Sequence, residues 1–185
     1  MLRRLLLIPL LFALAACQGP QVQRDFDPTR DFSAYRAWSW QEPALQYRPD
    51  DPRIKSDLTE QRIRAAVAEQ LDQQGLRPAT AGKAADIKVQ AWYIVDQRTQ
   101  QYTTTSGAWG NPWYGYWGGP MFTDTRTIDY QVGTLQIDLY DAGDGKLVWR
   151  GSAEQLLGRR QANPQQREAA IQALVARILS QYPPY

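Results

Sequence analysis

The sequence predicts a single α/β (α+β) domain, a two-layer sandwich in which a four-stranded mixed sheet carries two helices on one face. Two segments repeat apolar residues at helical spacing, and four others alternate apolar and polar residues as strands do. Their order along the chain is β-α-β-β-β-α. Two helices with one-sided apolar stripes can both be buried against one face of such a sheet. The predicted domain spans residues 32–185 and follows a leader and a tether.

The two predicted helices cover residues 57–75 and about 164–181. The first carries an apolar stripe at i, i+4 spacing and ends at Gly75; the stripe consists of Leu58, Ile63, Val67 and Leu71. The second begins at Pro164, because proline suits the first turn of a helix, and ends before two consecutive prolines. Its stripe consists of Ile171, Leu174, Val175, Ile178 and Leu179.

The four predicted strands cover residues 35–40, 86–96, 128–140 and 146–157. We expect the first two strands to be parallel, joined through the first helix, and the last three to form an antiparallel series. Residues 141–145 predict the hairpin turn between the last two strands. Within 128–140 the apolar phase changes at Gly133, so we expect a β-bulge there that restores one buried face.

The N-terminus has the parts of a secretory signal. Arg3 and Arg4 are followed by an apolar stretch, which is too short to cross a bilayer, and then by Leu14, Ala15, Ala16 and Cys17. This pattern resembles the lipobox of bacterial prolipoproteins. The resemblance implies cleavage of signal peptide 1–16, acylation of Cys17 and attachment to a membrane through those acyl chains, with residues 17–31 as a lipidated tether. By similarity to lipoprotein sorting rules, Gly19 implies the outer membrane of a Gram-negative bacterium, facing the periplasm.

The composition excludes several classes of function. Lys and Arg total 21 and Asp and Glu 19, and because Arg3 and Arg4 lie in the leader, the remainder carries 19 of each. Nucleic-acid binding, which needs a basic surface, is therefore not expected. The chain has no histidine and one cysteine, so we expect no His-dependent catalysis, no zinc site and no cofactor. We expect no enzyme; the alternative is an envelope hydrolase that uses paired carboxylates, Asp138 with Asp141 or Asp124 with Asp129.

Residues 102–120 are rich in glycine and aromatic residues and predict a long insertion loop. Its candidate partner-binding residues are Trp109, Trp113, Tyr114, Tyr116 and Trp117. Three interpretations remain open. The rings pack over the sheet face near Trp92 and Ile94, they bind an envelope protein or polysaccharide, or they lie at the membrane interface.

Several motifs, in order along the chain, resemble the bacterial lipoprotein family catalogued as domain of unknown function 4136. The resemblance covers essentially the whole chain after the leader and implies an envelope lipoprotein, without implying a reaction. The residues that carry it lie at 24–27, 31–35, 62–67, 85–87, 115–119, 130–139 and 147–151.

Overall fold

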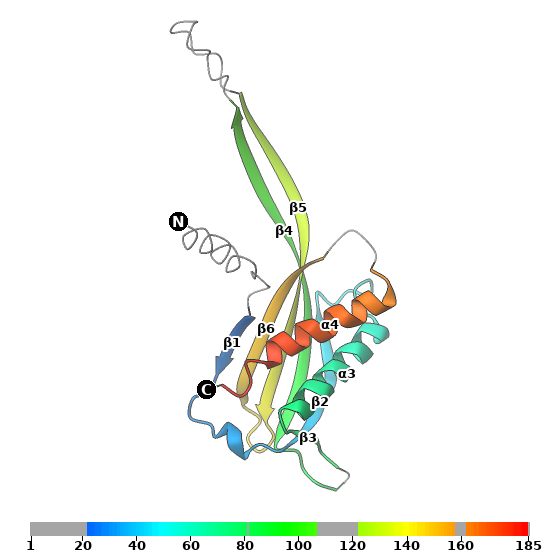
Figure 1. Ribbon diagram of the computed structural model, residues 1–185, viewed down its shortest axis with the longest axis vertical. Helices are drawn as coiled ribbons and strands as arrows, with labels where there is room; N and C mark the ends of the chain where they lie inside the picture. The colour runs from blue at the N-terminus through cyan, green and yellow to red at the C-terminus, as the bar shows by residue number, and fades with distance from the viewer. Residues whose placement is uncertain (1–21, 81, 107–121, 158–161, 185) are drawn as a thin grey trace, which may run out of the picture.

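The computed structural model describes residues 22–80, 82–106, 122–157 and 162–184. In these residues a six-stranded mixed sheet carries two α-helices on one face (Figure 1). The helices are α3 (Asp57–Gln73) and α4 (Pro164–Leu179), and a 3-10 turn, η1, covers Phe32–Ala34. The strands are β1 (Val22–Phe26), β2 (Ala37–Arg48), β3 (Arg77–Pro78), β4 (Ile87–Ser106), β5 (Phe122–Asp141) and β6 (Leu147–Leu157).

The sheet order is β1-β6-β5-β4-β2-β3. Strand β2 is parallel to β4 and to β3, whereas β4, β5, β6 and β1 pair in antiparallel fashion. This confirms the α+β class, the parallel β-α-β unit and the antiparallel series that follows it. The prediction of four strands was wrong, because β1 and β3 add one strand at each edge of the sheet.

The first of these extra strands lies in the predicted tether. Val22 pairs with Ala153 and Phe26 with Trp149, so residues 22–26 belong to the sheet. Only the two ends of this strand are partly buried, and its three central residues are exposed and polar. A five-residue edge strand of this kind has too little alternation to be distinguished from a polar linker.

Both helices begin and end as their sequences indicate. The Ser56 hydroxyl caps α3 by accepting from the Thr59 backbone N–H at 3.3 Å, and Gly75 follows the helix with φ +87°. Asn163 and Gln166 form a capping box at the start of α4. One member of the predicted stripe is wrong, because Leu58 in the first turn of α3 is 60% exposed.

The core lies between the helices and one face of the sheet. Three central strands contribute a row of fully buried side chains, Val89, Leu139 and Trp149, that are adjacent across the sheet. Both helices cover them with residues such as Leu71 and Ile178. In the next row Gly151 lies beneath these side chains, and a Cβ added there would come within 2.8 Å of Ile178 Cγ2 and closer still to the Trp149 ring. The bare backbone at Gly151 therefore makes room for the indole.

The β-bulge expected at Gly133 is absent. The pairing of β4 with β5 is continuous there, with Ile94 opposite Thr134 and Val95 opposite Gly133. The apolar phase changes because Ile128 and its in-phase neighbours lie on the face opposite the helices, and Ile128 itself is 50% exposed. The register shift that β5 does have lies between Leu139 and Tyr140, against β6.

We predict that Gly151→Ala destabilises the fold by about 1–3 kcal/mol, because the added methyl group overpacks the site under Trp149. Urea denaturation measures the change in the free energy of unfolding. The control is Ser152→Ala, whose side chain points to the opposite face of the same strand. Equal stability of the Gly151→Ala variant and the wild type would contradict this packing.

Candidate interaction surface

Strands β4 and β5 extend well beyond the rest of the sheet (Figure 1). Each has 20 residues, and they pair along their whole length. On one side β2 ends with Arg48 opposite Ile94, and on the other β6 ends with Leu157 opposite Gln131. Residues 98–106 and 122–130 therefore form a two-stranded β4–β5 ribbon. At about 3.3 Å per residue, this ribbon is about 30 Å long.

The described side chains of the β4–β5 ribbon are polar and mostly exposed. At its base Arg98 forms an ion pair with Glu154 of β6 at 2.6 Å. Across the ribbon, the Thr99 hydroxyl donates to Asp129 at 2.7 Å, and the hydroxyls of Thr103 and Thr125 are 3.4 Å apart. Neither helix covers either face of it. Cross-strand pairs of this kind contribute about 0.2–1 kcal/mol each, so the ribbon is held by local contacts alone.

The insertion loop predicted for residues 102–120 is shorter than expected. Residues 102–106 continue β4, and the segment between the ribbon strands is 107–121. The five candidate partner-binding residues, Trp109, Trp113, Tyr114, Tyr116 and Trp117, lie outside the described residues, as do Leu14, Ala15, Ala16 and Cys17. Sequence reasoning missed most of the ribbon because its strands, rich in threonine and other polar residues, offer no continuous apolar face.

The carboxylate pairs of the hydrolase alternative do not converge. Asp124 and Asp129 are five residues apart on one strand, so they point to opposite faces and are separated by about 16 Å along it. That exceeds the 6.5–9.5 Å of inverting glycosidases. Asp138 and Asp141 also point to opposite faces of β5, and each is engaged by other groups.

Asp138 is completely buried, on the sheet face opposite the helices. Arg150 of β6 binds it through two parallel hydrogen bonds, Nε to Oδ1 and Nη2 to Oδ2, both 2.7 Å. The amide of Gln136 and the hydroxyl of Tyr140 donate to the same carboxylate at 3.1 and 3.2 Å. The bonds from Asp138 raise the pKa of Arg150, and burial raises that of Tyr140. This buried carboxylate is a structural anion with its acceptor sites filled.

We predict that Arg150→Met destabilises the protein by about 3–5 kcal/mol, because it leaves the buried Asp138 without its counter-ion. The double variant Asp138→Asn/Arg150→Met should recover most of that loss, since neither charge remains. Thermal and urea unfolding of the single and double variants measure the coupling. If the two variants are equally unstable, the ion pair is not the source of the effect.

A hollow of about 410 Å³ opens beside this pair, and it is lined mainly by polar side chains. Gln41, Gln46 and Gln90 supply amides, and Lys88 supplies a cation. Asp141 also reaches the hollow, but its carboxylate is engaged by Tyr35, Arg30 and the backbone of the following turn. In the described ranges, no cluster of three or more His, Cys, Asp or Glu side chains is arranged to hold a metal ion.

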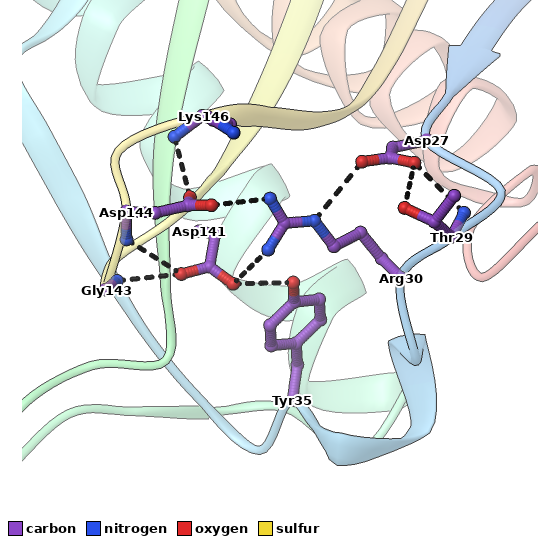
Figure 2. A network of polar contacts seen from close by, with 8 residues as sticks. All are labelled: Asp27, Thr29, Arg30, Tyr35, Asp141, Gly143, Asp144 and Lys146. Atoms are coloured by element: carbon purple, nitrogen blue, oxygen red, sulfur yellow. Dashed lines mark hydrogen bonds and ion pairs between the residues drawn. The ribbon is translucent and has the colours of Figure 1, made fainter.

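A second polar cluster, shown in Figure 2, joins the loop after β1 to the turn between β5 and β6. The Arg30 guanidinium contacts Asp27 at 3.2 Å, Asp141 at 3.3 Å and Asp144 at 2.6 Å. The Tyr35 hydroxyl donates to Asp141 at 2.9 Å. We call these five residues the Arg30 clamp. It fixes the chain that leaves β1 against the 141–145 turn, whose prediction as a hairpin turn is confirmed.

The clamp shifts the pKa values of its members. The Gly143 backbone N–H and the Tyr35 hydroxyl lower the pKa of Asp141, and the Arg30 guanidinium lowers that of Asp144. Hydrogen bonds from Thr29 lower the pKa of Asp27. Burial, together with the bond to Asp141, raises the pKa of Tyr35 to about 12. At neutral pH the three aspartates of the clamp are therefore negatively charged and Arg30 is positively charged.

We predict a stability loss at acid pH that depends on Arg30. The Arg30 guanidinium holds the pKa of Asp144 below its ordinary value of 3.8, so this pair stabilises the protein fully above that pH, and the contribution is lost as pH falls through the lowered value. In urea titrations between pH 7 and 2, Arg30→Gln should be less stable at neutral pH and should lose less stability on acidification. Arg62→Gln, the charge-matched control on α3, should behave as the wild type; an identical slope for Arg30→Gln would exclude the clamp as the cause.

A known sequence family shares the features of this chain. These are two helices packed on a mixed sheet and the motifs of residues 24–151 in the same order. The sequence profile described as domain of unknown function (DUF4136) matches residues 22–184. The chain belongs to the DUF4136 family. No protein of curated function matches the sequence. The family membership confirms the resemblance, and it carries no assigned activity.

Solved structures resemble this chain at low sequence identity. A PDZ domain protein from Parabacteroides distasonis ATCC 8503 superposes with a TM-score of 0.54 and 15% identity, covering 89% of this chain and 35% of that one. This DUF4136 chain thus spans about a third of that protein. A DUF4136 family protein from Bacteroides thetaiotaomicron VPI-5482 has a TM-score of 0.47 and 20% identity, covering 90% and 97%. A PelC dodecamer from Paraburkholderia phytofirmans has a TM-score of 0.45 and 15% identity, covering 88% and 96%.

Proposed function

We propose that this DUF4136 protein is an outer-membrane lipoprotein, anchored through acyl chains on Cys17 and facing the periplasm, that acts by binding without catalysis. In this proposal the aromatic segment 107–121 contacts a partner protein or an envelope polysaccharide. The observation that carries it is the β4–β5 ribbon, which joins that segment to the domain about 30 Å beyond the end of the covered sheet. Trp and Tyr are the residues most often found as anchors of binding surfaces.

The length of the ribbon argues against the interpretation that the aromatic rings serve only to cover the sheet. Trp92 is 14 residues from Ser106 on the same strand, which is about 46 Å. A 15-residue segment held at both ends reaches only about 25 Å. Trp92 has other cover, since the Arg48 guanidinium lies 4.8 Å from the centre of its ring.

The direction of β1 supports a second candidate, in which the segment rests in the lipid headgroups. Val22 lies at the end of β1 nearer the ribbon, in the row of Ala153 and Leu135. Cys17 is five residues upstream and at most about 18 Å away, whereas the ribbon strand from Leu135 to Phe122 extends about 43 Å. Since the 18 Å reach is about 25 Å short of the ribbon end, this candidate requires the ribbon to lie along the surface of the leaflet that holds Cys17, an interface that Trp and Tyr favour.

Membrane attachment is tested through the single cysteine. We predict that Cys17→Ser moves the protein from the membrane fraction to the soluble periplasmic fraction of a bacterial host, because the thioether that carries the acyl chains cannot form. Labelling with a radioactive fatty acid should mark the wild type and not the variant. A wild-type protein without label would contradict the proposal.

The contact surface is tested by replacing Trp113 and Trp117 together with alanine. We predict a loss of chemical crosslinks to other envelope components in intact cells, because Trp side chains anchor binding surfaces. The melting temperature should stay within about 2 °C of the wild type, because the described core residues are left unchanged. Leu58→Ala, which removes an exposed apolar side chain from α3, is the control. A large fall in melting temperature would support a packing role. A second experiment measures binding to phospholipid vesicles with the Cys17→Ser protein, which carries no acyl chains. If that protein binds and the two alanine changes abolish its binding, the headgroup candidate is favoured.

A further inference from the structure

One edge of the β4–β5 ribbon has an unusual sequence. Residues 122–130 of β5 pair with β4 on one side, and on the other side β6 has already ended at Leu157. The first seven residues of this edge are Phe-Thr-Asp-Thr-Arg-Thr-Ile, at 122–128. The sequence is symmetric in character about Thr125. On its two sides stand first the opposite charges of Asp124 and Arg126, then a threonine on each side, and then a large apolar residue at each end.

We infer that this edge pairs with the same edge of a second copy of the chain, in antiparallel fashion about a two-fold axis at Thr125. Asp124 of each copy then lies opposite Arg126 of the other, Thr123 opposite Thr127, and Phe122 opposite Ile128. Residues directly opposite in an antiparallel pair lie on the same face with Cβ atoms about 4.5–5.5 Å apart, and opposite charges at such positions attract. The pairing would also satisfy the free backbone groups of the edge, which proteins seldom leave open over such a length.

The charges select one register. In an antiparallel ladder only every second residue of β5 directs its N–H and C=O toward the free edge, so a homotypic pair can use only registers in which the two residue numbers sum to an even value. The charged residues of this edge are Asp124, Arg126 and Asp129. Among the registers with an even sum, those that bring two charged residues opposite each other pair Asp124, Arg126 or Asp129 with its own copy, or pair Asp124 with Arg126. The last is the register proposed, and it alone sets opposite charges against each other.

The exposure of these side chains also supports a second copy of the chain as the partner of this edge. Arg126 and Asp124 are 79% and 62% exposed, and their ion pair within one strand, Nε to Oδ2 at 3.0 Å, leaves both accessible to a second copy. Ile128 is 50% exposed in the single chain. On the other ribbon edge β4 is unpaired from Val95 onward, and Asp96 and Arg98 have the same spacing there, but Arg98 forms an ion pair with Glu154 of β6 at 2.6 Å. Outward from Gln97 the residues do not repeat, since Val95 would stand against Thr99, so the symmetric pattern lies on β5 and its complement is β5 itself.

Disulfide trapping tests the two-fold axis in the full-length chain, produced in bacterial cells. At the axis Thr125 lies opposite its own copy, with a Cα separation of about 4.5–5.5 Å, which is within the range that a disulfide bridges. Thr125→Cys should give a covalent dimer under mild oxidation. Thr103→Cys is the matched control, because Thr103 pairs with Thr125 across the ribbon but would be two strands further from its counterpart. No dimer with Thr125→Cys, or an equal yield with Thr103→Cys, would overturn the inference.

Charge exchange, introduced into the Thr125→Cys chain, tests the register. Asp124→Arg makes both positions positive and Arg126→Asp makes both negative, so each variant alone should lose dimer yield by about tenfold or more, as two attractive pairs become repulsive. When the two variants are produced together, the mixed pair is again complementary and the dimer should return. The double variant Asp124→Arg/Arg126→Asp should also dimerise. Unchanged yield in the single variants, or no recovery in the mixture, would exclude this register. Both disulfide experiments use the full-length chain with Cys17→Ser, so that the introduced cysteine is the one thiol present and the result does not depend on acylation of Cys17.

Discussion

The antiparallel ladder between β4 and β5 runs from Ile87 opposite Asp141 to Ser106 opposite Phe122. Its inner part is covered by both helices and flanked by β2 and β6, so it carries the fully buried residues of the core. Its outer part has no flanking strand and no helix above it. One uninterrupted pairing thus joins a packed domain to an exposed ribbon, and the backbone hydrogen bonds of the ladder set how far Ser106 and Phe122 lie from the core.

Two polar clusters hold the base of this ladder. The buried pair of Asp138 and Arg150 ties β5 to β6 on the face without helices. The Arg30 clamp ties the loop after β1 to the 141–145 turn at the end of β5 (Figure 2). Together they engage Asp138 and Asp141, one of the two carboxylate pairs of the hydrolase alternative. The ribbon is the part of the described sheet whose side chains are mostly exposed.

The sequence predicted those elements whose burial is periodic. Both helices and most of the residues predicted for the four strands were correct, because residues such as Ile63, Val89 and Leu174 recur at the spacing of one buried face. It could not predict β1 or the outer halves of β4 and β5, since strands without a buried face show no apolar period. The burial of Asp138 was missed because it depends on Arg150, which is 12 residues away in sequence and directly opposite in the sheet. The predicted partner-binding residues lie within the segment 107–121, which the ribbon strands bound at Ser106 and Phe122, and they are outside the described residues.

The central claim is that the ribbon extends away from the domain instead of folding back on it. Spin labels at Thr125 and Lys146, in a Cys17→Ser background mixed with excess unlabelled protein so that pairs of labels on two copies do not contribute, would lie near opposite ends of β5. Pulsed electron paramagnetic resonance should then give a distance of about 50 Å, from 16 residues at 3.3 Å each. A narrow distribution centred below about 30 Å would show that the ribbon lies against the domain and would contradict the extended arrangement.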